Sequence, residues 1–246
     1  MICEHHHYGD KRSQFGELFL PAGSDSRPPP PPPFPVAVVL HGGFWKAQYS
    51  RKLMHPLCHD LAARGWAAWN LEYRRLWRLN GGGWPNTFDD LDAGVDHLRV
   101  LQAPLDLERV VAIGHSAGGH LAVLAATRPG PSVLVTAVVS QAGVLDLVRA
   151  WEWQLSGGVV RRLLGGTPEQ RPERYAAASP AARLPIGVPV LLTHGGKDDI
   201  VPPAMSKEFQ RATGCDLVLL PDEDHFGHLD PENPLWRAVV EWMGPA

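Results

Sequence analysis

The sequence predicts an α/β fold, with a mostly parallel central sheet and helices on both of its faces. Short apolar runs alternate with helical patterns along most of the 246 residues. Several of these runs lack the in–out alternation of a half-exposed strand, which is typical of strands buried on both faces. The length also suits a single core, because cores grow to roughly 250–300 residues. We therefore expect one domain over residues 1–246, in which residues 143–187 form a small helical cap.

The first half of the chain contains three expected strands and two expected helices. The strands are apolar runs bounded by glycine, proline or polar residues, and the helices carry apolar positions three and four residues apart. In the longer helix, acidic residues also occupy the first turns, where they favour the helix dipole. The strands are expected at residues 16–20, 36–40 and 66–71, and the helices at 51–64 and 87–102.

The second half continues the alternation. By the same criteria, strands are expected at residues 110–113, 133–139, 188–192 and 217–220, and helices at 117–127, 203–213 and 233–243. In an open parallel sheet, ligands bind beyond the carboxyl ends of the strands. We therefore expect the functional residues directly after the strands.

Composition and charge exclude several classes of protein. Lys and Arg number 23 and Asp and Glu 26, for a formal net charge of −3, so no basic excess favours nucleic-acid binding. No apolar run approaches the roughly 20 residues that span a bilayer, and no signal-peptide pattern opens the chain. Cys3, Cys58 and Cys215 form no CxxC pair, which disfavours a disulfide framework. We therefore expect a cytoplasmic protein with no nucleic-acid or membrane partner; the oligomeric state stays open.

The sharpest signal is a G-x-S-x-G motif, formed by Gly114, Ser116 and Gly118, between an apolar strand and an alanine-rich helix. A tight strand-to-helix turn of this kind projects one hydroxyl into a cleft. The glycines let neighbouring backbone approach without a Cβ clash, and the helix N-terminus directs its free N–H groups at a developing oxyanion. We predict that Ser116 is a catalytic nucleophile; the alternative is a serine that only caps the helix.

A nucleophilic serine needs a general base, and the base needs a carboxylate that orients it. In this type of fold both follow the serine in the chain, in loops after later strands. Asp198 follows the apolar run at 188–192, and His225 follows the run at 217–220. We predict Asp198 as the orienting acid and His225 as the base. Asp199 and His228 are the alternatives, since each lies close to the favoured residue in the chain.

An oxyanion hole is expected after the strand at 36–40, where the chain reads His41-Gly42-Gly43-Phe44-Trp45. Two glycines let backbone N–H groups crowd a substrate oxygen, and the residue after the nucleophile supplies the second donor. We predict the N–H groups of Phe44 (or Gly43) and Ala117 as donors. His41 is expected to hold this loop by hydrogen bonds.

Together these segments resemble the α/β-hydrolase superfamily, and most closely the esterases grouped with animal-type kynurenine formamidase (arylformamidase) and bacterial feruloyl and acetyl-xylan esterases. The resemblance covers nearly the whole chain. Its motifs are Gly16-Glu17-Leu18-Phe19-Leu20-Pro21, His41-Gly42-Gly43-Phe44-Trp45, Glu72-Tyr73-Arg74, Gly83-Trp84-Pro85, Gly114-His115-Ser116-Ala117-Gly118-Gly119-His120, Ser179-Pro180, His194-Gly195-Gly196-Lys197-Asp198-Asp199-Ile200-Val201-Pro202 and Asp224-His225-Phe226. Two features depart from the family pattern, the proline run at 28–33 and the second histidine at 228.

The resemblance implies a serine hydrolase that forms an acyl-enzyme and needs no cofactor. Its expected substrates are small-molecule carboxylic esters with small or aromatic groups, and also aryl formamides or other amides. A short-peptide peptidase and, less favoured, a non-catalytic binding protein of the same fold are the alternatives. Nine tryptophans are many for this length, and we expect Trp45 and Trp84 to line the substrate pocket.

Three further features have ordinary interpretations. His5-His6-His7 is expected to be a mobile tail rather than a metal site, and we expect no metal elsewhere. The prolines at 28–33 are expected to form a stiff surface turn rather than a ligand for a proline-reading domain. The segment Glu72-Tyr73-Arg74-Arg75 is expected to be an ion-paired loop.

Overall fold

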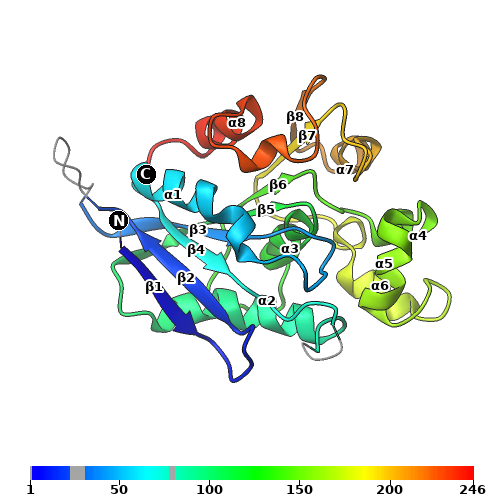
Figure 1. The fold of residues 1–246 in the computed structure, drawn as a ribbon, viewed down its shortest axis with the longest axis horizontal. Helices are drawn as coiled ribbons and strands as arrows, with labels where there is room; N and C mark the ends of the chain where they lie inside the picture. Colours follow the sequence, from blue (N-terminus) through cyan, green and yellow to red (C-terminus); the bar gives the residue numbers. More distant parts are fainter. Residues whose placement is uncertain (1, 23–30, 78–80) are drawn as a thin grey trace.

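The computed structural model describes residues 2–22, 31–77 and 81–246. Its centre is an eight-stranded sheet with the order β1-β2-β4-β3-β5-β6-β7-β8 (Figure 1). The strands are β1 (Ile2–His7), β2 (Phe15–Leu20), β3 (Phe34–Leu40), β4 (Ala67–Leu71), β5 (Leu105–His115), β6 (Ala137–Gln141), β7 (Val190–Gly195) and β8 (Asp216–Leu220). The pairings from β4 to β8 are parallel, and the β1–β2 and β2–β4 pairings are antiparallel. The chain thus has an α/β-hydrolase fold.

Helices cover both faces of the sheet, as expected for strands that are apolar on both sides. The helices are α1 (His55–Ala63), α2 (Asn86–Asp96), α3 (Ala117–Ala126), α4 (Leu147–Glu152), α5 (Leu155–Leu164), α6 (Pro172–Ala178), α7 (Ala204–Thr213) and α8 (Pro234–Met243), with short 3₁₀ turns at Arg51–Met54, His97–Val100, Pro180–Ala182 and Gly227–Leu229. Buried side chains of α1 and α8 form one core layer. Those of α2, α3 and α7 belong to the layer on the other face.

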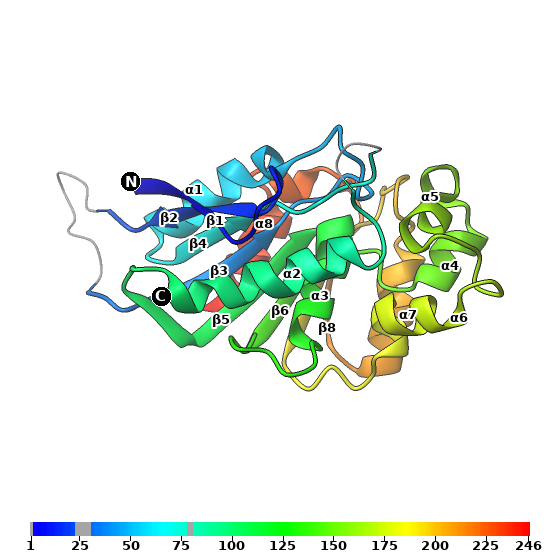
Figure 2. The ribbon, with the colours of Figure 1, turned by 90° about the horizontal axis from the view of Figure 1, so that it is seen from below.

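Helices α4, α5 and α6 lie between β6 and β7 in the chain and gather at one end of the molecule (Figures 1 and 2). Two hydrogen bonds connect them to loops that follow strands. The backbone N–H of Trp84 donates to Leu163 O at 2.7 Å, and Lys46 Nζ donates to Ser156 Oγ at 2.7 Å. These three helices make up about half of the segment 143–187.

The sequence placed most elements within a few residues of their bounds, but the strand expected at 133–139 is wrong in its first half. Strand β6 begins only at Ala137. Val133 and Val135 are buried without joining the ladder, and the Val133 carbonyl accepts a hydrogen bond from Arg128 Nη2 at 2.7 Å instead. The apolar run therefore predicted a longer strand than the structure has, because two of its valines pack in the core without joining the sheet.

The expected histidine tail is also wrong, because His5, His6 and His7 belong to β1. This edge strand pairs with all of β2, from Ile2 opposite Leu20 to His7 opposite Phe15. Backbone hydrogen bonds hold an edge strand whatever its side chains are, so an apolar pattern was not required here. Of the proline run, residues 31–33 are exposed between β2 and β3, and Pro28–Pro30 lie outside the described residues.

Candidate active site

Ser116 occupies the sharp turn between β5 and α3. Its φ of +56° and ψ of −117° are unusual for a residue with a side chain. Two glycines make the turn possible: a Cβ on Gly114 would lie 2.0 Å from Gly118 O, and a Cβ on Gly118 would lie 2.0 Å from Leu40 O. The Ser116 side chain makes no helix-capping hydrogen bond, so the capping alternative does not describe it.

Asp198 and His225 meet at the carboxyl ends of β7 and β8. Asp198 Oδ2 accepts a hydrogen bond from His225 Nδ1 at 2.6 Å, and both side chains are buried. The neighbouring Asp199 is exposed. His228 forms a 3.2 Å hydrogen bond with Thr193 Oγ1. The geometry therefore pairs the two residues that the sequence favoured.

Asp198 is surrounded by hydrogen-bond donors. Its Oδ1 accepts from the N–H groups of Ile200 at 2.9 Å and Val201 at 2.8 Å, and His194 Nε2 lies 3.1 Å from Oδ2. Burial opposes the charged carboxylate, but the hydrogen bonds from His194 and His225 outweigh it and hold the pKa of Asp198 well below its usual range. The carboxylate is therefore charged across the physiological range.

Two further histidines, His115 and His228, surround His225, and the sequence motifs predicted no role for His115. His115 Nε2 donates to the His225 backbone carbonyl at 2.8 Å, and its ring centroid lies 4.6 Å from that of His225. Burial first, and then the neighbouring His225, lower the pKa of His115 to about 3. Burial likewise lowers the pKa of His228. His115 is the variable residue before Ser116 in the motif, and only its neighbours in space reveal its role.

The loop after β3 passes directly beside Ser116. A Cβ on Gly42 would lie 3.0 Å from the Ser116 Cβ. Phe44 and Trp45 both have positive φ angles, 49° and 55°. The backbone is therefore in the left-handed region, which residues with a side chain rarely adopt. Among the described residues, no hydrogen-bond acceptor is found for the N–H groups of Phe44 and Ala117.

A buried polar layer supports this loop from beneath. His41 Nδ1 donates to Gly42 O at 2.7 Å and His41 Nε2 to Glu72 Oε1 at 3.0 Å. Both of these partners are hydrogen-bond acceptors. The His41 ring stacks on Tyr73 with 4.4 Å between centroids, and Tyr73 Oη donates to His41 O at 2.8 Å. The structure thus agrees with the expected supporting role of His41.

The two tryptophans predicted to line the pocket differ in exposure. Trp45 is fully buried and packs edge-on against His120, with 5.1 Å between ring centroids. In this conformation it offers no exposed surface to a ligand. Trp84 is partly exposed and lies 5.3 Å from the Phe88 ring. Trp84 thus keeps some accessible surface.

Comparison with known proteins places this geometry in a family. Residues 28–213, which are more than half of the chain, match the BD-FAE family. The chain belongs to the BD-FAE family. This match covers β3, β5 and β7, and it includes Ser116 and Asp198 but ends before His225.

Individual relatives of this BD-FAE chain include two bacterial proteins. Esterase LipQ of Mycobacterium tuberculosis is 28% identical over 193 residues, which are 72% of this chain and 45% of LipQ. The uncharacterized peptidase YtmA of Bacillus subtilis is 32% identical over 133 residues, which are 51% of each chain. The chain spans about half the length of the curated relatives it matches. Among solved structures, esterase 2 of Thermogutta terrifontis shares the fold, with a TM-score of 0.76, 24% identity, and coverage of 98% of this chain and 89% of that one.

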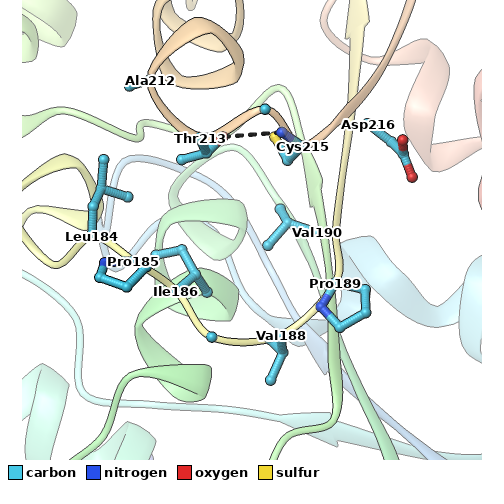
Figure 3. A pocket seen from close by; sticks show the side chains of 12 residues that line it. Leu184, Pro185, Ile186, Val188, Pro189, Val190, Ala212, Thr213, Cys215 and Asp216 are labelled. Atoms are coloured by element: carbon cyan, nitrogen blue, oxygen red, sulfur yellow. Dashed lines mark hydrogen bonds between the residues drawn. The ribbon is translucent and has the colours of Figure 1, made fainter.

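One cavity of the BD-FAE chain is remote from Ser116. It has a volume of about 630 Å³ and lies between residues 184–190 and 212–216 (Figure 3). Val190 and Asp216 are the first residues of β7 and β8, so this cavity lies at the edge of the sheet opposite the one that carries Asp198 and His225. Within the described ranges, no cluster of three or more His, Cys, Asp or Glu side chains is arranged to hold a metal, and no helix there is long and apolar enough to cross a membrane.

Proposed function

We propose that this chain is a serine hydrolase that cleaves small-molecule carboxylic esters without a cofactor. The 2.6 Å hydrogen bond between Asp198 and His225 carries the proposal, because it joins an acid and a base from the loops after the neighbouring strands β7 and β8, at the edge of the sheet where Ser116 lies. The strained turn at Ser116 supports it, as does the similarity to esterases.

The proposed reaction follows the roles that the geometry favours. His225 removes the Ser116 proton as the hydroxyl attacks the ester carbonyl, and Asp198 holds the imidazole in the required tautomer and stabilises its charged form. The N–H groups of Phe44 and Ala117 stabilise the oxyanion; Gly43 is the alternative donor in the loop. His225 then protonates the leaving alcohol, and a water molecule releases the acyl group from Ser116.

We propose esters with small or aromatic groups as the substrate class, and aryl formamides as a related class. Esterase 2 of Thermogutta terrifontis has been solved with butyrate and with propionate bound, which supports a short acyl group. Trp84, which is partly exposed, is proposed to line the pocket, and the fully buried Trp45 to support the loop beneath it. Helices α4–α6 are proposed to cap the site and to limit it to compact substrates.

Replacement of the nucleophile tests the proposal. Ser116→Ala should abolish the hydrolysis of p-nitrophenyl acetate while circular dichroism and the melting temperature stay as in the wild type. A fluorophosphonate should label the wild type once, at Ser116, as located by peptide mass spectrometry. Labelling at another residue, retained activity in Ser116→Ala, or ligand binding without any turnover by the wild type would each refute the assignment.

A peptidase is the second candidate, because the chain is 32% identical to a part of the uncharacterized peptidase YtmA. The same catalytic residues would serve an amide substrate. A panel of acetyl, butyryl and feruloyl esters, N-formylkynurenine and a short peptide amide separates the candidates. We expect turnover of esters, and cleavage of the peptide with a higher kcat/KM than any ester would favour the peptidase.

A further inference from the structure

A second cavity, of about 550 Å³, opens beside the predicted oxyanion loop. Three segments line it: the turn between β1 and β2, residues 47–52 directly after the loop, and residues 72–77 directly after β4. Since the loop follows β3 and residues 72–77 follow the parallel strand β4, this cavity lies on the same edge of the sheet as Ser116. The proposed mechanism uses none of its exposed side chains.

The lining of this cavity is strongly cationic. It contains Arg12, Arg51, Lys52 and Arg75, and among the described residues that line it Glu72 is the only carboxylate. The Glu72 carboxylate is already occupied, because it accepts from His41 Nε2 at 3.0 Å and from the N–H of Tyr73 at 3.1 Å and of Arg51 at 3.3 Å. Glu17 and Glu72 balance Arg51 and Arg75, so among the described residues the positive charges of Arg12 and Lys52 stay unbalanced.

Arg12 and Lys52 are the cations available to a ligand. Both are exposed, and within the described residues neither forms an ion pair. Arg51 and Arg75 are mostly buried, with 15% and 13% of the side chain exposed, and pair with Glu17 and Glu72. Arg75 Nε lies 3.3 Å from Glu72 Oε1, whereas in the part of the chain that the structure describes the buried Nε of Arg51 has no hydrogen-bond acceptor. The Arg51 Nε donor favours an anion, because a buried donor without a partner is costly.

Aromatic surface accompanies the positive charge. Trp77 lines the cavity with 62% of its surface exposed, which is unusual for so large an apolar side chain. Phe15 lines it as well, and the Arg51 guanidinium lies 4.6 Å from the centre of the Phe15 ring. A flat ring suits such a surface, since indole and guanidinium groups both stack on aromatic faces.

The cavity is coupled to the predicted oxyanion loop through backbone contacts. The N–H of Leu76, between Arg75 and Trp77, donates to Trp45 O at 2.7 Å. Arg75 Nη1 donates to the Tyr49 carbonyl, and the Tyr49 side chain packs so closely on Gly43 that a Cβ there would lie 2.4 Å away. A ligand in the cavity would therefore contact the segments that hold the loop in place.

We propose that this cavity binds an aromatic carboxylate, whose acid group pairs with Arg12 and Lys52 while its ring packs against Trp77. The carboxylate is either the remote acid group of the ester substrate or a separate small acid. The first of these sources rests on the proposed function, because it requires an ester substrate. Both sources share this chemistry, and the experiment separates them.

Binding to the Ser116→Ala protein tests the site without any turnover. Calorimetric titration should show that 4-acetoxybenzoate binds at least about tenfold more tightly than its neutral methyl ester. Raising the salt concentration from about 50 to 500 mM should reduce this preference, because exposed charges are screened. Equal affinities for the acidic and neutral esters, or a preference that salt does not change, would overturn the proposal.

Matched variants locate the site. Arg12→Gln with Lys52→Gln should remove the preference for the acidic ester and leave the affinity for the neutral ester unchanged. Lys207→Gln with Arg211→Gln, which changes two exposed cations of α7, should leave both affinities unchanged. Trp77→Ala should lower the affinity of the protein for both esters. If the first double variant keeps the preference while its circular dichroism is native, the site is not this cavity.

Turnover then identifies the source of the acid. If the acid belongs to the substrate, the protein with Ser116 intact hydrolyses the acidic ester with a higher kcat/KM than the methyl ester, and the Arg12 and Lys52 double variant loses this difference. If the acid is a separate ligand, 4-hydroxybenzoate binds with the same dependence on these two residues, and both esters are hydrolysed alike. Failure to hydrolyse any ester would refute the proposed function but not the binding site, which the titrations decide.

Discussion

His194 and His225 share one carboxylate oxygen, because Asp198 Oδ2 lies 2.6 Å from His225 Nδ1 and 3.1 Å from His194 Nε2. His194 Nδ1 lies 2.7 Å from Ser206 Oγ, and its Nε2 lies 2.9 Å from Val201 O. The Val201 carbonyl and the carboxylate only accept, so Nε2 carries the proton and Ser206 donates to Nδ1. His194 therefore withdraws part of the negative charge that Asp198 offers to His225.

Replacing His194 should change the pH dependence of catalysis. In His194→Phe, Asp198 loses one donor, its pKa rises from its lowered value, and its charge stabilises the protonated form of His225 more strongly. The acid limb of the kcat/KM profile should therefore move to higher pH. His194→Gln retains an N–H donor and should keep the wild-type profile. A His194→Phe profile that matches the wild type would show that His194 only packs the loop.

Replacing Asp198, the proposed orienting acid, should reduce the rate of catalysis far more than the affinity for substrate. Asp198→Asn removes the charge and places an amide where His225 Nδ1 donates, which favours the wrong tautomer of the imidazole. We expect kcat for p-nitrophenyl acetate to fall by roughly 10³–10⁴. Asp199→Asn, at the exposed neighbour, is the matched control and should stay near wild type. The reverse result would assign the acid to Asp199.

The turn at Ser116 should not tolerate a side chain at Gly114. A Cβ there would lie 2.0 Å from Gly118 O, and backbone cannot yield as a flexible side chain does. Gly114→Ala should lower the free energy of unfolding in urea by about 3 kcal/mol or more. Gly130→Ala is the comparison, because no atom lies within 4 Å of its Cβ and only its φ of +60° opposes alanine; we expect a loss of about 1–2 kcal/mol. Similar losses in both variants would contradict the steric argument.

The stability of the fold should depend on the neutral state of His115. Burial lowers its pKa to about 3, whereas an unfolded histidine titrates near 6.5. The unfolded chain therefore binds more protons between these values, and the contribution of His115 is present above pH 6.5 and lost as the pH falls toward 3. His115→Gln should reduce the slope of unfolding free energy against pH in this window, by at most ~1.4 kcal/mol per pH unit. An unchanged slope would show that His115 is not neutral when folded.

Most of the fold was predictable because its strands and helices have strong local signals. The buried runs that became β3, β5 and β7 are apolar throughout, and the turn at Ser116 requires glycines that are visible in the sequence. Strand β1 was missed because its six residues contain three histidines, and its order comes from pairing with β2. The start of β6 was misplaced because buried valines outside the sheet resemble a strand.

The sequence by itself determined the alternation of strands and helices, the tight turn at Ser116 and the short set of candidate acids and bases, since these depend on local residue type and spacing. Only the tertiary structure showed that Asp198, and not Asp199, is the partner of His225. It also showed that His115 and His194 lie around this pair and that Trp45 is buried. It also gathered Arg12, Lys52 and Trp77 around one cavity. Hydrogen bonds and charges act over a few ångströms, and these residues come within that range only when distant segments of the chain are brought together at one edge of the sheet.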